Sequence, residues 1–372
     1  MTFTRTSSEA PLVVYGSTAS YYTGKLEAYL RAKGIPYRLE PFSESNMRRC
    51  AAHTGVVQIP QVECPDGSWL VDTTLIIEYF ERTRPEPRVT PRDPAVAFVS
   101  RLIEDYADEW LWRPAMHYRW SFPETARLMS AWLAEHVRER SVPEWLKRLY
   151  WRRRQYRSFV KGDGVADETR AVVEGFYLDT LAVLESIVAR RPFILGGRPT
   201  EADFGFFGSM FRHFFSDPAP GRIMRERAPG VHEWVARMWN LRPDRLDSMP
   251  LPNRLPDDLG PLLSTVTGVY LPYLDANAAA YSRDEKVVRY PVEGTTFVEP
   301  VKPYRVWCRD RLQCHFAELD GAARAEVQRV FASVEAGARL ATPSPKPVEN
   351  LIGSLPLTAR PGSETVDSWW RK

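Results

Sequence analysis

A proline between two short strand-like segments, followed soon by an apolar helix, is the feature that most constrains the fold of this chain. The proline lies within Gln58-Ile-Pro-Gln-Val62, and a turn at Pro65-Asp66-Gly67 leads to the apolar run Val71-Asp-Thr-Thr-Leu-Ile-Ile-Glu-Tyr-Phe80. Short apolar runs bounded by turn residues predict strands, and the longer run after Asp72 predicts a helix. The acidic-hydroxyl pair Asp72-Thr73 therefore lies at a helix start.

The proline and the acidic-hydroxyl pair together predict a surface that binds a peptide and an anion. If the Ile59-Pro60 bond is cis, the N–H and C=O of Ile59 turn outward and can pair with an extended peptide. Thr73 lies where free N–H groups and the helix dipole favour a carboxylate, and Asp72 is placed to hold an ammonium beside it. One anion and one cation on the same carbon are the α-amino acid end of a small peptide.

The beginning of the chain predicts a strand, a loop and a helix. Leu12-Val-Val-Tyr15 is a short apolar strand, and Tyr21 to Lys33 has helical spacing before Gly34-Ile35-Pro36 stops it. Ser20 comes at the N-terminus of this helix. Glutaredoxin-like proteins carry Cys-x-x-Cys in this loop, whereas this chain has Ser20-Tyr21-Tyr22-Thr23, so we expect no dithiol redox chemistry.

Residues 10 to about 95 resemble the N-terminal, thioredoxin-like domain of cytosolic glutathione transferases of the serine type, such as the theta, zeta and many bacterial classes. Ser20-Tyr21-Tyr22 lies where these proteins have Ser-Pro-Tyr or Ser-Ser-Cys, and Gln58-Ile59-Pro60 is similar to the zeta-like Gln-Val-Pro. Asp72-Thr73 matches their Glu-Ser or Gln-Ser pair. Farther on, Leu195-Gly-Gly-Arg-Pro-Thr-Glu-Ala-Asp203 resembles the family's capping box, in which Thr200 and Asp203 satisfy free N–H groups.

The resemblance implies glutathione as the bound peptide, held by the residues Gln58, Ile59, Pro60, Asp72 and Thr73. The same resemblance makes Ser20 the catalytic hydroxyl, which stabilises the glutathione thiolate beside the positive end of the first helix. Ser20 can also be read as a plain helix cap, and Tyr21 or Tyr22 could supply the donor instead. Tyr22 stands where the zeta motif has cysteine. We therefore expect conjugation or another thiol-assisted reaction in preference to maleylacetoacetate isomerisation.

The implied fold class is an α/β thioredoxin-like N-terminal domain at 10–90 and an all-α transferase C-terminal domain at 93–250, with an α+β extension at 251–372. Helical periodicity supports the middle part, with helices expected at 96–112, 124–138, 144–160, 167–190, 201–215 and 231–241. In a transferase fold the first of these helices lines the cleft above the thiol. The candidate residues for a substrate pocket there are Tyr106, Trp110, His117 and Arg119, with core packing as the alternative.

The chain leaves the family pattern beyond Pro250. We expect helices at 262–280, broken at Pro272, and at 304–318 and 322–340, with a hairpin at 287–298 that turns near Glu293-Gly294. This part has too little regular structure for a core of its own, so we expect it to pack on the helical domain. For the tail from Pro343 to Lys372, which ends in Trp369-Trp370, attachment to a surface groove and disorder are both open.

Charge and composition bound the partners and the location. A net charge of +3 implies no acidic polymer, and the basic run 147–157 keeps helical spacing of its apolar residues, so we expect no nucleic acid. No run approaches a membrane span, and four scattered cysteines suit a reducing compartment, so we expect no membrane and a cytoplasmic location. Cys308, Cys314 and His315 lack zinc-ligand spacing, and no metal is expected. The resemblance implies a homodimer.

Three classes of function stay open. The first is a glutathione-dependent enzyme that attacks a small hydrophobic electrophile: a transferase, or an isomerase, lyase or ether-cleaving relative. The second is a glutathione-binding protein without turnover. The third is a biosynthetic enzyme in which the extension closes a pocket for a specialised substrate. Presence of Ser20, Pro60, Asp72 and Thr73 together favours an enzyme over a purely structural descendant.

Overall fold

The first part of the chain forms the expected α/β unit around a four-stranded sheet. A computed structural model describes residues 10–136, 142–331, 333–348, 351–352 and 355–357. The sheet has the order β2-β1-β3-β4, with β2 parallel to β1 and the other neighbours antiparallel. Its elements are β1 (Leu12–Gly16), α1 (Tyr21–Lys33), β2 (Tyr37–Pro41), α2 (Glu44–Thr54), β3 (Gln61–Glu63), β4 (Trp69–Val71) and α3 (Thr73–Thr83).

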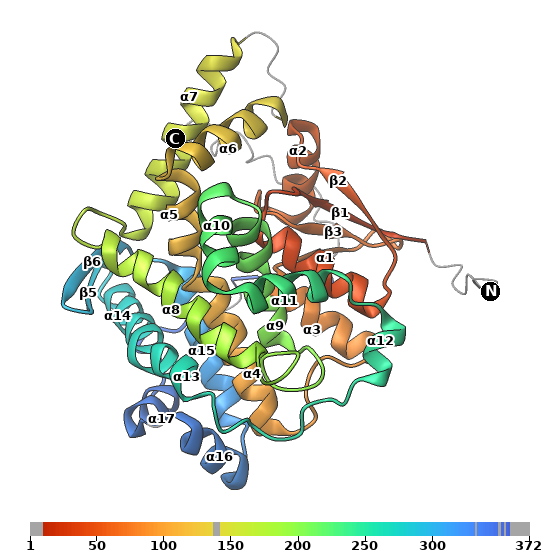
Figure 1. The fold of residues 1–372 in the computed structure, drawn as a ribbon, viewed down its shortest axis with the longest axis vertical. Coiled ribbons are helices and arrows are strands. Elements are labelled where there is room, and N and C mark those ends of the chain that lie inside the picture. The colour runs from red at the N-terminus through yellow and green to blue at the C-terminus, as the bar shows by residue number, and fades with distance from the viewer. Residues whose placement is uncertain (1–9, 137–141, 332, 349–350, 353–354, 358–372) are drawn as a thin grey trace.

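The second part of the chain, from Pro94 to Ser248, consists of helices and loops among its described residues. They are α4 (Pro94–Glu109), α5 (Trp112–Trp120), α6 (Pro123–His136), α7 (Glu144–Gln155), α8 (Arg170–Val188), α9 (Glu201–Ser209), α10 (Pro218–Arg227), α11 (Pro229–Trp239) and α12 (Pro243–Ser248), with short turns η1 (Tyr156–Val160), η2 (Lys161–Asp163) and η3 (Met210–Phe215). Helices α4 and α9 pack together and against α1, while α6 and α7 project beyond the rest (Figure 1).

The capping box predicted before α9 is confirmed. Asp203 Oδ2 accepts from the N–H of Thr200 at 3.0 Å, and Asp203 Oδ1 accepts from Ile194 N at 2.9 Å. One buried carboxylate thus satisfies the N–H of the N-cap residue and the N–H of Ile194 in the loop before the helix.

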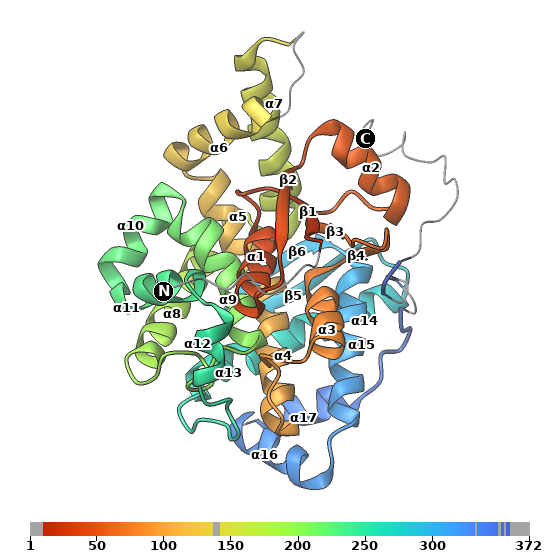
Figure 2. The same cartoon turned by 90° about the vertical axis from the view of Figure 1, so that its right-hand side faces the viewer.

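The extension packs on the helical domain and reaches back to the α/β unit. It consists of α13 (Gly260–Thr265), η4 (Val266–Tyr270), α14 (Leu271–Ser282), β5 (Val287–Val292), β6 (Thr295–Pro300), α15 (Pro303–Ala317), α16 (Gly321–Phe331) and α17 (Val334–Ala341). Helices α15 and α16 lie against α4, and α3 lies near α15 on the same side (Figure 2). One hydrophobic core runs from Leu12 to Leu340 through all three parts.

The chain end also returns to the sheet. Leu357 pairs with Trp69 in β4 through two backbone hydrogen bonds, of 2.8 and 3.0 Å, and packs beside Tyr15 and Cys50. The tail is therefore attached to the outer strand at Leu357, while Ser344, Lys346 and Val348 bond to residues of the extension. The expectation for Trp369-Trp370 lies outside the described residues.

Three helix predictions differ from the structure, and one of them, the helix expected at 322–340, is divided into α16 and α17 before Ser333, which has an extended backbone. The helix expected over 96–112 ends at Glu109, because Pro114 has no N–H to donate to the carbonyl of Trp110, and the chain restarts as α5. The helix expected to break at Pro272 passes through that residue, because a π-helical turn, η4, precedes the proline and places it in the first turn of α14. Among the described helices, none is long and apolar enough to span a membrane.

Candidate functional site

The sheet register brings the expected site residues to one edge of the α/β unit. Tyr15 of β1 pairs with Gln61 of β3, and Gln61 pairs with Val71 of β4. The loop that carries Ser20 follows β1, the segment 58–60 precedes β3, and Asp72-Thr73 follows β4. Because β3 runs antiparallel to both β1 and β4, the end of β1, the start of β3 and the end of β4 lie at the same end of the sheet, and all three segments meet there.

Ser20 is the N-cap of α1 and keeps a free hydroxyl hydrogen. Its Oγ accepts from the N–H of Thr23 at 3.3 Å, and its own O–H finds no acceptor among the described residues. The hydroxyl therefore lies at the positive end of the helix with one hydrogen to donate. That arrangement suits an anionic sulfur and also performs the plain capping function.

The two neighbouring tyrosines are committed to backbone carbonyls. Tyr21 donates to Ala107 O, and Tyr22 donates to Asp108 O at 3.1 Å. Burial raises the pKa of both phenols well above the ordinary value, and nearby carboxylates raise it further. Neither hydroxyl can turn to a thiolate without giving up its carbonyl partner.

The segment before β3 leaves part of its backbone without a hydrogen bond. The Ile59-Pro60 bond is cis, Ile59 is half-buried, and its N–H and C=O form no hydrogen bond within the described residues. Gln58 contributes its carbonyl to Gln61 Nε2 at 2.9 Å, which fixes the turn. The backbone of Ile59 is thus available to an extended peptide.

Asp72 caps α3 and meets the extension. It has a positive φ of 68°, and its Oδ1 accepts from Thr74 N at 3.1 Å and Leu75 N at 3.2 Å. Its Oδ2 accepts from the hydroxyl of Tyr304 in α15 at 2.6 Å. Thr73 is buried beside it. The oxygen expected to hold an ammonium is therefore shared with a residue of the extension.

A buried lysine ties α1 to α3 and α4 directly behind this edge. Lys25 Nζ forms ion pairs with Glu104 and Asp108 and donates to Thr74 Oγ1 at 3.2 Å. Burial lowers the pKa of Lys25, but the two carboxylates raise it more, so its net shift is upward. The lysine therefore stays charged and holds the three helices together, and removing it would leave two buried carboxylates without their cation.

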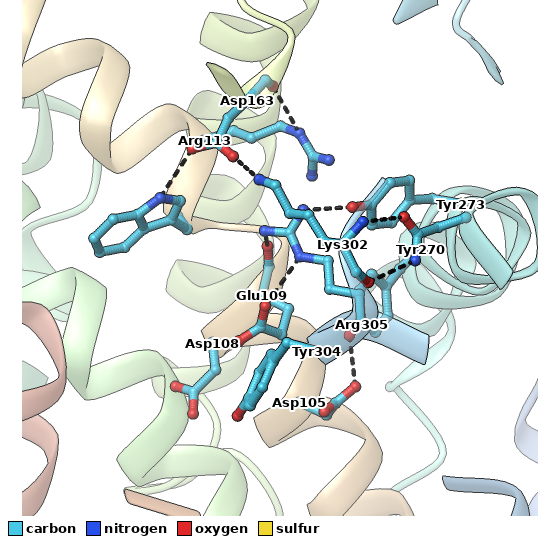
Figure 3. A network of polar contacts seen from close by, with 12 residues as sticks. Asp105, Asp108, Glu109, Arg113, Asp163, Tyr270, Tyr273, Lys302, Tyr304 and Arg305 are labelled. Carbon is cyan, nitrogen blue, oxygen red and sulfur yellow. Dashed lines mark hydrogen bonds and ion pairs between the residues drawn. The ribbon is translucent and has the colours of Figure 1, made fainter. Parts of the chain in front are cut away.

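The extension adds a second buried polar network next to Tyr22 and Asp72. Lys302 pairs with Asp163, and Arg305 pairs with Glu109 at 3.0 Å and bonds to Tyr273 (Figure 3). In the same network Glu299 lies among Arg113, Lys302 and Arg305. The extension is thereby fixed to α4, α5 and η2 by charge as well as by packing.

The four candidate pocket residues do not form one cluster. Tyr106 and Trp110 are buried in the core, where Trp110 packs against Tyr273 of the extension at 5.5 Å between ring centroids. Arg119 pairs with Asp217 and donates to Ala19 O at 2.7 Å, so it supports the loop that carries Ser20. His117 lines a separate cavity between α5 and α7.

Several residues at this edge were not singled out from the sequence. Trp112 stacks on Tyr22 with ring centroids 5.7 Å apart and donates from Nε1 to Asp163 at 3.0 Å. Asp108 and Lys25 bridge the two domains, and Tyr304 reaches Asp72 from the extension. The one available signal was Pro114, which shifts the helix phase and turns Trp112 toward the α/β unit.

Comparisons with known proteins bear on two parts of the chain. The family model described as "Glutathione S-transferase, N-terminal domain" matches residues 14–88, and the one described as "Glutathione S-transferase, C-terminal domain" matches residues 170–237. These matches support the glutathione transferase superfamily. They also confirm the fold class: a thioredoxin-like domain, a helical transferase domain and an additional α+β region.

Individual relatives are distant. Maleylacetoacetate isomerase of Mus musculus is 28% identical over 99 residues, which are 25% of this chain and 45% of that protein, so the match spans less than half of the relative. A glutathione S-transferase of Methylobacterium radiotolerans, solved with glutathione sulfonate, is 20% identical with a TM-score of 0.39 and covers 66% of this chain and 98% of its own. Beta-etherase LigF of Sphingobium sp. strain SYK-6 is 20% identical with a TM-score of 0.45, covering 64% and 99%.

Proposed function

We propose that this chain, which matches both domain models of the glutathione S-transferases, is a glutathione-dependent transferase of the serine type that activates the thiol for attack on a small hydrophobic electrophile. The observation that carries the proposal is that three features meet at one end of the sheet. They are the free hydroxyl hydrogen of Ser20, the unpaired backbone of Ile59 and the helix start at Asp72-Thr73. Each has a counterpart in the peptide: thiol, cysteinyl backbone and α-amino acid end.

Ser20 is the proposed donor to the sulfur. A free thiol has a pKa of about 8.5, so most of it is protonated at neutral pH. The Ser20 hydroxyl and the dipole of α1 both favour the charged form and so lower that pKa. In the proposed conjugation the thiol proton passes to water, the sulfur lone pair forms the C–S bond, and the leaving group departs with the electrons of the broken bond.

The peptide frame is proposed to lie along Gln58, Ile59 and Pro60, with its carboxylate at Thr73 and its ammonium at Asp72. The hydrogen bond from Tyr304 leaves Asp72 Oδ2 one further lone pair for an ammonium. The acceptor side is proposed to be formed by the helical domain, where Arg119 supports the Ser20 loop. We propose that Tyr106 and Trp110 shape it from the core, whereas His117 lines a separate cavity and has no part in it.

One observation favours a second function, a glutathione transferase-like protein without turnover. The Tyr304 hydroxyl occupies the carboxylate that an ammonium needs, and burial raises the pKa of Tyr304, with Asp72 raising it further. A phenol held in this way stays protonated and competes for the oxygen. Thiol-assisted isomerisation, lysis or ether cleavage uses the same site and stays an alternative reaction.

Calorimetric titration with glutathione tests the site. Asp72→Asn keeps a side chain that caps helices and tolerates positive φ but removes the charge. It should weaken binding by about 1–3 kcal/mol, the range for a charged group left without its partner. Asp66→Asn, in an exposed turn, is the matched control and should bind like wild type.

Tyr304→Phe separates the two functions. If the wild-type protein binds glutathione and turns over electrophiles, the transferase proposal stands. If the wild-type protein binds glutathione without turning over electrophiles, or if only Tyr304→Phe binds glutathione, the second function holds. If neither protein binds glutathione, the proposed glutathione site is wrong.

Assembly as a homodimer and a cytoplasmic location complete the proposal, on the resemblance of the first domain. Light scattering of the purified chain gives the mass that decides between one copy and two.

A further inference from the structure

A cavity of about 630 Å³ lies between α5, α7 and the start of α8, away from the proposed glutathione site. Its inner wall consists of His117, Trp120 and Phe122, of which His117 and Trp120 are almost fully buried. Its outer wall is α7, which has no buried residue of its own. A volume of this size is typical of sites that enclose small organic ligands.

The cavity lies on a different face of α5 from the one that contacts the α/β unit. His117 and Trp120 are one helical turn apart and point to α7, whereas Arg119 bonds to Ala19 O at 2.7 Å and Trp112 stacks on Tyr22. Trp112 and Arg119 are two turns apart on the other face. Helix α5 therefore separates the cavity from Ser20.

The rim of the cavity carries unpaired positive charge. Arg152 and Arg153 of α7 line it, are exposed, and form no ion pair among the described residues. Arg170 also lines it and pairs with Asp167 at 2.5 Å. Glu174 is the single acid in the lining, and it accepts from His117 Nε2 at 2.9 Å. Three arginines thus face one carboxylate that already has a partner.

The lining of the cavity is largely apolar, and the residues that form it also hold buried polar atoms without partners. Trp120, Phe122, Leu149 and Tyr156 provide rings and an aliphatic side chain. Among the described residues, the buried atoms His117 Nδ1, Trp120 Nε1 and Ser121 Oγ have no hydrogen-bond partner. Because these three atoms have almost no accessible surface, a guest in the cavity would contact the rings and not these atoms.

We propose that this cavity is a binding site for an aromatic carboxylate, whose ring lies against Trp120, Phe122 and Tyr156 and whose anion is held by Arg152 and Arg153. Guanidinium groups match the planar geometry of a carboxylate and hold it by paired hydrogen bonds. The site does not depend on glutathione chemistry, and it stands or falls separately from the proposed function.

Calorimetry of the full chain with naphthalene-2-carboxylate tests the proposal, with naphthalene-2-methanol as the neutral probe of the same shape. The double variant Arg152→Ala/Arg153→Ala should weaken binding of the carboxylate by about tenfold or more, the loss of one charge-assisted hydrogen bond. Arg154→Ala is the matched control, because Arg154 is exposed on the same helix and contacts Trp151 instead of the cavity. It should bind like wild type.

Leu149→Trp provides a second variant that does not touch the charges. Leu149 is 40% exposed on α7, so a larger ring narrows the cavity without disturbing the core, and it should weaken both probes. Saturable binding that prefers the carboxylate and fails in the double variant supports the site. No saturable binding, equal affinity for the alcohol, equal loss in Arg154→Ala, or loss in Ser20→Ala alone would each overturn it.

Discussion

At the scale of single residues, Ser20 combines two functions that a mutation can separate. Ser20→Ala should leave glutathione affinity nearly unchanged, because the hydroxyl acts on the sulfur and not on the peptide frame. Loss of one hydrogen bond to a charged group should raise the pKa of the bound thiol by about 1–2 units and slow turnover accordingly. A pH titration of thiolate absorbance measures the shift.

Ser43→Ala is the matched control for this variant. Ser43 caps α2 in the same way, with its Oγ accepting from Asn46 N at 3.3 Å, so both variants lose one N-cap. An equal change in both proteins would reduce the Ser20 effect to helix stability. A shift in Tyr22→Phe without one in Ser20→Ala would move the donor to Tyr22.

Glu299 makes stability depend on pH. Burial alone would raise its pKa, but Arg113, Lys302 and Arg305 lower it to about 2 from 4.5. A depressed carboxyl stabilises the folded state above its unfolded pKa, and this contribution, about 3 kcal/mol, is lost as pH falls from 4.5 toward 2.

Urea midpoints of wild type and Glu299→Gln, measured at pH 6 and pH 3.5, test this assignment. The variant should be less stable at pH 6, and the gap should narrow at pH 3.5. Glu285→Gln, which removes an exposed pair with Arg283, should differ little from wild type at either pH. A gap that stays constant with pH would contradict the assignment.

At the scale of elements, the β5-β6 hairpin turns through two residues with positive φ, Glu293 at 47° and Gly294 at 77°. Asparagine tolerates this conformation better than glutamate does, and Asn-Gly is the preferred pair in such turns. Glu293→Asn should therefore stabilise the protein by about 0.5–1 kcal/mol, and Gly294→Ala should destabilise it by about 1–2 kcal/mol. The melting temperatures of both variants, compared with wild type, test this. A shift in the same direction for both variants would refute the turn argument.

The elements that local patterns specify could be predicted from the sequence. The hairpin, the capping box at Thr200 and Asp203, and the strand-loop-helix around Ser20 each depend on a few adjacent residues, and the structure contains all three. The break at Trp110 was missed because a proline inside an apolar pattern can end or kink a helix, and periodicity does not decide which.

The rest of the candidate site depends on contacts between distant segments. No local pattern around Asp72 predicts its hydrogen bond with Tyr304. No local pattern around Lys25 predicts its ion pairs with Glu104 and Asp108. Such pairs follow from how three parts of the chain pack, which a pattern along one segment does not encode.

At the scale of the whole molecule, the extension is part of the core and not an appendage. Removing it after Pro250 would expose Trp110 and leave Arg113 and Glu109 without Glu299 and Arg305. The truncation would uncover a wide apolar surface of the core, so the truncated chain should aggregate or melt far below the full chain. Thermal melting and the soluble fraction measure this, and a truncated chain with an unchanged melting temperature would show an independent extension.

The pairing of Leu357 with Trp69 sets an order of events in the cell. Translation runs from the N-terminus, so β4 emerges from the ribosome long before the segment that covers its free edge. Until Leu357 has emerged, the nascent α/β unit presents an unpaired strand edge, and until Tyr304 has emerged, Asp72 is without its hydrogen bond from α15. Both contacts therefore form after the α/β unit has left the ribosome.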